Sequence, residues 1–148
     1  MSDTSNNSLP EPKIEGEKLE EYRSIYKELL GFVPPRIQAR TDLLGRLDPE
    51  FLSLQEEIRK RGMYPDVFDV KTVQLMLFGM LLLSLRDAAR IHGIAARRAG
   101  ATWEEMQAVV NLAYLYGGLS AANIGAQFIQ QIAEMEAEQE VEATQGQS

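Results

Sequence analysis

Apolar residues recur at helical spacing along most of the chain, and no stretch alternates apolar and polar positions as a half-buried strand does. The pattern predicts a first amphipathic helix over residues 16–30, ended by Gly31, and a short second helix over residues 36–44. Asp48-Pro49 predicts the start of a third helix, because aspartate caps a helix and proline fits its first turn. Gly62 ends that helix, whose expected inner face consists of Phe51, Leu54 and Ile58.

Four further helices are predicted in the second half of the chain. The longest apolar run predicts a buried helix over residues 70–85, and the next helix, over residues 87–99, carries the only histidine, His92. Thr102 and Glu105 have the spacing of a capping box, which predicts a helix start there. Gly117-Gly118 is expected to break that helix. A last helix then follows, with a core face of Ile124, Phe128, Ile132 and Met135.

Charge divides the 148 residues into a middle segment and two tails. Residues 1–21 carry a net charge of −4 and residues 134–148 a net charge of −5, whereas the segment between them carries +2. We expect residues 1–14 and 136–148 to be disordered, because they bury too little apolar surface to offset the entropy of ordering. Residues 15–135 are expected to form one all-α domain.

Composition excludes several classes of chemistry. The chain contains no cysteine, so it has no disulfide, thiolate nucleophile or thiolate metal ligand. A single histidine excludes a multi-histidine metal site within one chain, and we expect no metal. The sequence lacks the dense basic stripe that nucleic-acid binding needs, an apolar run long enough to span a bilayer, and an export signal. We therefore expect a cytoplasmic protein with no nucleic-acid or membrane partner.

His92 is the first candidate for chemistry, because imidazole is the one side chain here that titrates near neutral pH without perturbation. Small apolar residues share its face of the helix, namely Ala88, Ala89, Ala95, Ala96 and Ala99. Two interpretations fit this pattern. His92 either transfers protons in an apolar pocket or packs at a close helix contact and donates to a backbone carbonyl.

Other candidates have both a structural and a functional interpretation. Glu105 either caps its helix or acts in catalysis. Tyr116 and Asn123 flank the Gly-Gly break, where a ligand can approach the backbone or the helix simply ends. Arg86 and Arg90 are either solvated or bind a substrate carboxylate in a two-pronged contact.

The stretch from about Asp69 to Gln131 resembles the carboxymuconolactone decarboxylase family, which shares its fold with the AhpD-like alkylhydroperoxidases. The residues that carry the resemblance are His92 with its alanine-rich half-helix, Ala99-Gly100-Ala101-Thr102 with Glu105, and Tyr116-Gly117-Gly118-Leu119-Ser120-Ala121-Ala122. The resemblance implies an AhpD-like helical bundle that assembles into trimers or hexamers. It also implies that His92 lines a pocket at or near a subunit interface.

The family has two branches with different chemistry. The peroxidase branch uses a Cys-x-x-Cys pair, and the matching positions here are Leu85 and Ala88, which excludes thiol peroxidase activity. The decarboxylase branch uses no cofactor, and its histidine corresponds to His92. Many relatives have one acid a turn before the histidine and another near the start of the long helix. Here these positions correspond to Ala88 and approximately Gln74.

Two functional hypotheses follow from the residues and the resemblance. The first is a cofactor-free lyase or isomerase of aromatic compound catabolism that acts on a small, anionic carboxylated ring or lactone. In this hypothesis His92, Glu105 and Tyr116 are catalytic, and Arg86, Arg90, Gln74 and Asn123 bind substrate. The second is a non-catalytic oligomeric protein that binds small molecules or serves as a scaffold and has lost the family's acids.

Overall fold

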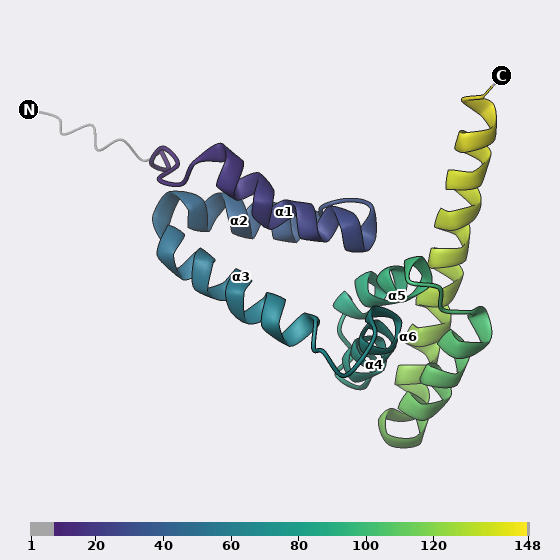
Figure 1. Ribbon diagram of the computed structural model, residues 1–148. Helices are drawn as coiled ribbons and strands as arrows, with labels where there is room; N and C mark the ends of the chain where they lie inside the picture. Colours follow the sequence, from purple (N-terminus) through teal and green to yellow (C-terminus); the bar gives the residue numbers. More distant parts are fainter. Residues whose placement is uncertain (1–7, 148) are drawn as a thin grey trace, which may run out of the picture. The chain divides into compact units, whose positions relative to one another are not determined.

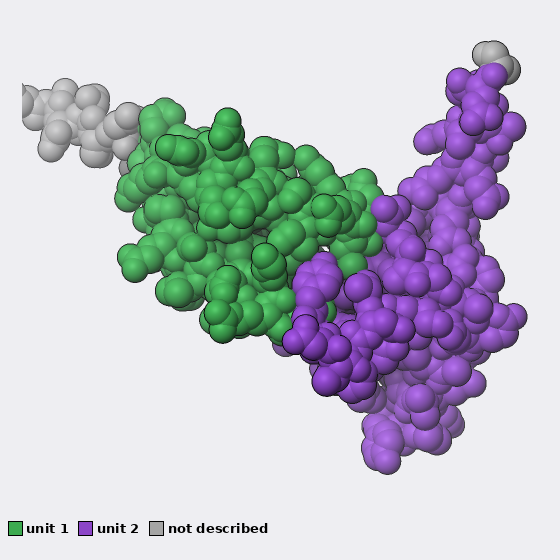
Figure 2. Space-filling view, in the orientation of Figure 1, with its two compact units in different colours: residues 1–63 green, residues 64–148 purple. Residues whose placement is uncertain are grey.

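The computed structural model describes residues 8–147 and, within them, six α-helices and no strand (Figure 1). The helices are α1 (Gly16–Leu30), α2 (Pro35–Leu47), α3 (Pro49–Met63), α4 (Val70–Leu83), α5 (Ala88–Arg98) and α6 (Trp103–Gln145). The predicted all-α fold class is therefore confirmed. Where we expected one domain, the chain divides into two compact units, Met1–Met63 and Tyr64–Ser148 (Figure 2).

Two polar clusters hold the three helices of the first unit together. Arg23 of α1 is buried and donates from Nε and Nη2 to Thr41 Oγ1 of α2, at 3.1 and 2.9 Å. Glu56 of α3 is also buried. It accepts from Tyr26 Oη at 3.2 Å and from Arg40 Nη2 at 2.5 Å. The second cluster joins all three helices, and burial raises the pKa of Tyr26.

The expected inner face of α3 is wrong. Its apolar residues Phe51, Leu54 and Ile58 are each more than half exposed, whereas Leu52 and Glu56 are buried. The apolar spacing alone pointed to one face of the helix. The opposite face is buried instead, because Tyr26 and Arg40 donate hydrogen bonds to the Glu56 carboxylate and Arg40 neutralises its charge.

Both predicted tails contain ordered segments. Residues 1–7 lie outside the described part of the chain, but Lys13 donates its backbone N–H to Gly45 O of α2 at 2.9 Å. At the other end, α6 continues to Gln145 instead of ending near residue 135. Glutamate, glutamine and alanine are good helix formers, and Arg97 of α5 holds Glu136 by two hydrogen bonds of 3.0 and 2.7 Å. Beyond Glu136 the helix extends away from the body of its unit (Figure 2).

The second unit consists of α4, α5 and α6, and it contains all the candidate site residues. Phe78 and Leu82 of α4, Ile94 of α5, and Met106 and Ile132 of α6 form its core. The predicted capping box is confirmed: Glu105 N–H donates to Thr102 Oγ1 at 3.1 Å, and Thr102 N–H donates to Glu105 Oε2 at 2.8 Å. The predicted Gly-Gly break is a kink within α6, where Gly118 adopts φ 68° and ψ −161°, a conformation that only glycine tolerates well.

The buried helix predicted over residues 70–85 differs from α4 in two ways. It ends at Leu83, because Leu85 adopts a left-handed conformation with φ 51°. It is also buried on one side only, since Met76, Met80 and Leu83 are each at least two-fifths exposed. Within residues 8–147 no helix combines the length and apolar content needed to cross a bilayer.

Candidate functional site

His92 forms a hydrogen-bonded pair with Gln74, which lies on the neighbouring helix α4. The ring nitrogen Nδ1 is 2.7 Å from Gln74 Oε1. Gln74 is fully buried, whereas His92 is half-buried on α5. A buried amide fixed by its helix therefore sets the orientation of a partly accessible imidazole.

The direction of this hydrogen bond depends on which ring nitrogen carries the proton. With the amide oxygen facing the ring, only a protonated Nδ1 can donate, since a carbonyl oxygen has no hydrogen to give. The neutral ring then carries its lone pair on Nε2, the nitrogen that can accept a proton from another group. Gln74 is neutral, so it orients the ring without adding the charge that a carboxylate would place beside an imidazolium.

Close helix packing explains why this pair is positioned so tightly. A Cβ added at Gly93, the residue after His92, would lie 2.8 Å from Ile132 Cδ1 and 3.2 Å from Met106 Cε. Ala89 and Ala96, on the same helix, are fully buried. The small residues seen in the sequence therefore let α5 approach α6 and α4 closely. This packing fixes the position of His92 relative to Gln74.

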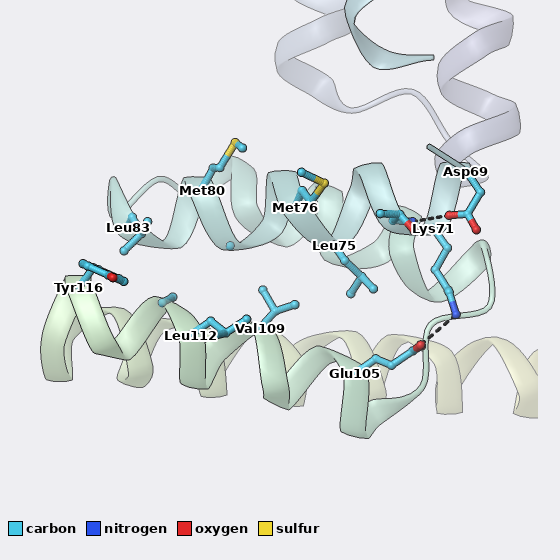
Figure 3. Close-up of a pocket in the computed structure, with 13 residues that line it drawn as sticks. Asp69, Lys71, Leu75, Met76, Met80, Leu83, Glu105, Val109, Leu112 and Tyr116 are labelled. Carbon is cyan, nitrogen blue, oxygen red and sulfur yellow. Dashed lines mark hydrogen bonds and ion pairs between the residues drawn. The ribbon is translucent and has the colours of Figure 1, made fainter. Parts of the chain in front are cut away.

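A second feature of this unit is an open groove of about 600 Å³ between α4 and the first half of α6 (Figure 3). Its α4 wall consists mainly of Leu75, Met76, Gly79, Met80 and Leu83, and its α6 wall of Val109, Leu112, Ala113 and Tyr116. His92 and Gln74 do not line it. Met76 and Gly79, which line the groove, come two and five residues after Gln74 and therefore lie on the opposite face of α4. The groove and the histidine pair are therefore separated by α4 itself.

An ion pair closes one end of the groove. Lys71 Nζ of α4 lies 2.9 Å from Glu105 Oε1 of α6. Figure 3 shows this pair at one end of the groove and Tyr116 at the other end, near Leu83. The hydrogen bond from Lys71 lowers the pKa of Glu105, and the same bond raises the pKa of Lys71. Both groups are thus charged at neutral pH, and Glu105 is engaged as a cap and an ion-pair partner.

Within residues 8–147 the structure shows no hydrogen bond between His92 and the other candidate residues. Tyr116 is 90% exposed on the groove, eleven residues along α6 from Glu105, or about 16 Å at 1.5 Å per residue. Arg86 is exposed in the turn before α5, and Asn123 is exposed on α6. Arg90 lies two residues before His92, a spacing at which helical side chains do not face each other. Of the candidate residues, the structure thus joins Gln74 to His92, and the roles of the others stay predictions.

Sequence reasoning missed the groove residues Lys71, Met76 and Met80. Lys71 had a usable signal, because it is the only charged residue between Asp69 and Arg86. The methionines had none, since an apolar residue on an apolar helix is indistinguishable from core until its neighbours are known. Among residues 8–147 no group of three or more potential ligands is placed to hold a metal ion.

Comparisons with known proteins extend the resemblance seen in the motifs. Searches of curated proteins and of solved structures each returned no significant match. The model of the carboxymuconolactone decarboxylase family matches residues 49–131, from the start of α3 into the second half of α6. The match includes the histidine pair and both walls of the groove. Since it covers more than half of the 148 residues, the chain belongs to the carboxymuconolactone decarboxylase family.

Proposed function

We propose that the protein is a cofactor-free lyase or isomerase that acts on a small carboxylated ring or lactone, with His92 as the proton donor and acceptor. Family membership supports a decarboxylase-like or AhpD-like activity. The absence of cysteine removes the thiol chemistry of the peroxidase branch. The observation that carries the proposal is the 2.7 Å contact between His92 Nδ1 and Oε1 of the buried Gln74; in the tautomer with the proton on Nδ1, Nε2 is the basic atom of the ring.

The chemistry of such a site is a proton transfer at carbon. In an isomerase, Nε2 removes a proton beside a carbonyl, the electron pair moves onto the carbonyl oxygen, and the imidazolium returns the proton to another carbon. In a lyase, the bond to the carboxylate breaks with release of CO₂, the pair enters the same enolate, and the imidazolium protonates the carbon. Gln74 keeps the ring oriented in both cases. An exposed arginine such as Arg86 supplies a contact for the substrate carboxylate.

The assay measures loss of carboxymuconolactone and of related carboxylated lactones by absorbance, with CO₂ release followed separately. His92→Ala is expected to lower turnover by at least about 100-fold, the usual contribution of a positioned acid–base group. Asn123→Ala, an exposed change on the same unit, serves as the test of the predicted binding role and affects KM rather than kcat. Turnover that survives His92→Ala would rule out the proposed proton transfer.

A second candidate function is a non-catalytic protein that binds small molecules or serves as a scaffold. It is favoured by the neutral partner of His92 and by the position of the groove on the other face of α4. A thermal-shift screen with small aromatic acids and lactones separates the two functions. Ligand-induced stabilisation that persists in His92→Ala, without turnover in either protein, supports the binder.

The family resemblance also leads us to propose a homo-oligomer, a trimer or a hexamer, and separately we propose the cytoplasm as its location. Exposed apolar side chains on α3 and α4 support self-association, because folded monomers rarely expose large contiguous apolar patches. The mass in solution, measured by light scattering after size exclusion, tests this proposal independently of catalysis.

A further inference from the structure

We propose that Arg59 and Arg40, on the first unit, form a binding site for one small oxyanion, a phosphate or a carboxylate. The site is built on α1, α2 and α3, whereas the histidine pair and the groove belong to the second unit. It goes beyond the proposed function, because it does not depend on any activity of His92.

The first support is a guanidinium group without an acceptor. Arg59 of α3 lies over the Tyr26 ring, with Cζ 3.8 Å from the ring centre, and its Nη1 is buried. Across residues 8–147 no group accepts a hydrogen bond from Nη1, and Arg59 forms no ion pair. A buried N–H without an acceptor is costly, and a bound ion is one way to satisfy it. An oxyanion supplies both the acceptor and the opposite charge.

The second support is the balance of charges around Tyr26. The buried carboxylate of this cluster is Glu56, and Arg40 already neutralises it, with Nη2 2.5 Å from Glu56 Oε1. Arg59 then remains as a second, unbalanced positive charge beside the same tyrosine. Charges withdrawn from water are normally paired. One negative ligand therefore completes the cluster.

The third support is the charge at the end of α3. Arg59 begins the run Arg59-Lys60-Arg61, and the carboxylate of Glu57 is engaged by Arg61 at 2.7 Å. Bases in the last turn of a helix also suit its dipole, but that effect does not require a guanidinium to be buried over an aromatic ring. The excess of positive charge there raises the local concentration of anions.

The two arginines also have donors to spare. Arg40 donates from Nη1 to Gln55 at 2.7 Å, and from Nη2 to Tyr26 at 3.0 Å and to Glu56. These bonds use three of the five N–H groups of its guanidinium. The Arg40 side chain is 32% exposed and Arg59 is half-buried, so solvent reaches both. Because both groups contact one tyrosine side chain, an anion beside Tyr26 interacts with both charges, and a planar guanidinium fork suits carboxylate and phosphate oxygens.

Isothermal titration calorimetry of the full chain tests the site, with inorganic phosphate, acetate and chloride compared at one ionic strength. Wild type is expected to bind one equivalent of phosphate or acetate and no chloride, and the tighter oxyanion identifies the ligand class. Arg59→Met is expected to raise the dissociation constant at least about tenfold, because its charge-assisted hydrogen bonds are lost. Arg61→Met is the matched control on the same helix. Its side chain is 80% exposed, so we expect a change below about threefold.

A second variant keeps the test valid if Arg59→Met does not fold. Arg59→Lys retains the positive charge and loses the planar fork, so its affinity is expected to lie between those of wild type and Arg59→Met. Helix content by circular dichroism shows which variants are folded.

Three outcomes overturn the proposal. If wild type binds neither oxyanion more tightly than chloride, Arg59 only covers Tyr26. Binding that is unchanged in Arg59→Met shows an adventitious ion only, held elsewhere on the chain. Binding that is lost in His92→Ala places the anion at the histidine instead. Because the first outcome is read from wild type alone and measures no turnover, the oxyanion site and the proposed function can fail independently.

Discussion

Replacing Gln74 by glutamate tests whether this residue controls His92. The two side chains have nearly the same shape, so Gln74→Glu keeps an oxygen at the position 2.7 Å from His92 Nδ1. It adds a negative charge at a fully buried site, beside a ring that becomes positive when it binds a proton. The new negative charge stabilises the protonated, positively charged imidazole more than the neutral one. His92 therefore holds its second ring proton more tightly in the variant.

The magnitude follows from the distance and the burial. Two unit charges about 4 Å apart attract by about 4 kcal/mol at an effective dielectric constant of 20, which corresponds to about three pH units. Burial opposes this gain, because the new carboxylate loses its hydration. We therefore expect the midpoint of the His92 titration to rise by about one to two pH units. The two groups titrate as a coupled pair, so the shift belongs to both.

The assay is unusually direct, because His92 is the only histidine in the chain. A ¹H–¹³C NMR titration of its ring Hε1 gives one resonance, without assignment by mutation. Gln130→Glu, an exposed change in the same unit, is the control and is expected to move the midpoint by less than about 0.3 units because surface charges are screened. A midpoint that stays the same or falls in Gln74→Glu would refute the role given to the Gln74 contact.

Three further changes test the packing and the charges. Glu105→Gln keeps the cap but loses the ion pair. Because the pKa of Glu105 is lowered in the folded state, the stabilisation is present above about pH 4–5 and is lost as the pH falls through the folded-state pKa. The variant therefore melts below wild type at pH 7, and the difference shrinks on acidification. Gly125→Ala places a Cβ 2.7 Å from a valine side chain and is expected to cost about 1–3 kcal/mol in urea unfolding, whereas Gly62→Ala, with open space, gains up to about 1 kcal/mol. Arg40→Met leaves Glu56 buried without its cation and is expected to cost about 2–3 kcal/mol, less than a fully buried pair because Arg40 is 32% exposed.

Helix boundaries were predictable because short-range chemistry sets them. Gly31 ends α1 in a left-handed conformation with φ 84°, and Thr102 starts α6 through the expected capping box. Gly118 kinks α6 where the Gly-Gly break was predicted. Each of these helix ends and kinks depends on a few residues that are neighbours in the sequence, so it can be predicted without knowing the tertiary structure.

The buried faces were less predictable, because they depend on residues far apart in the sequence. The face of α3 is decided by Glu56, whose burial requires Tyr26 and Arg40 from two other helices. Gln74 could be placed near the histidine only through the family resemblance, since eighteen residues separate it from His92. The groove was missed for the same reason, as its two walls come from α4 and α6.

Helix α4 contributes to both the histidine pair and the groove, and it separates the two. Gln74 leaves it on one face and contacts His92, while Met76 and Met80 leave it on the other and line the groove. The contact between His92 and Gln74 forms within a single copy, since Gln74 is fully buried there and Gly93, the residue after His92, packs closely against Ile132 and Met106. Association through the groove therefore adds nothing to the orientation of the ring unless it shifts α4 as a whole. A rigid helix packed on both α5 and α6 resists such a shift, so a ligand or partner bound in the groove leaves the titration of His92 unchanged.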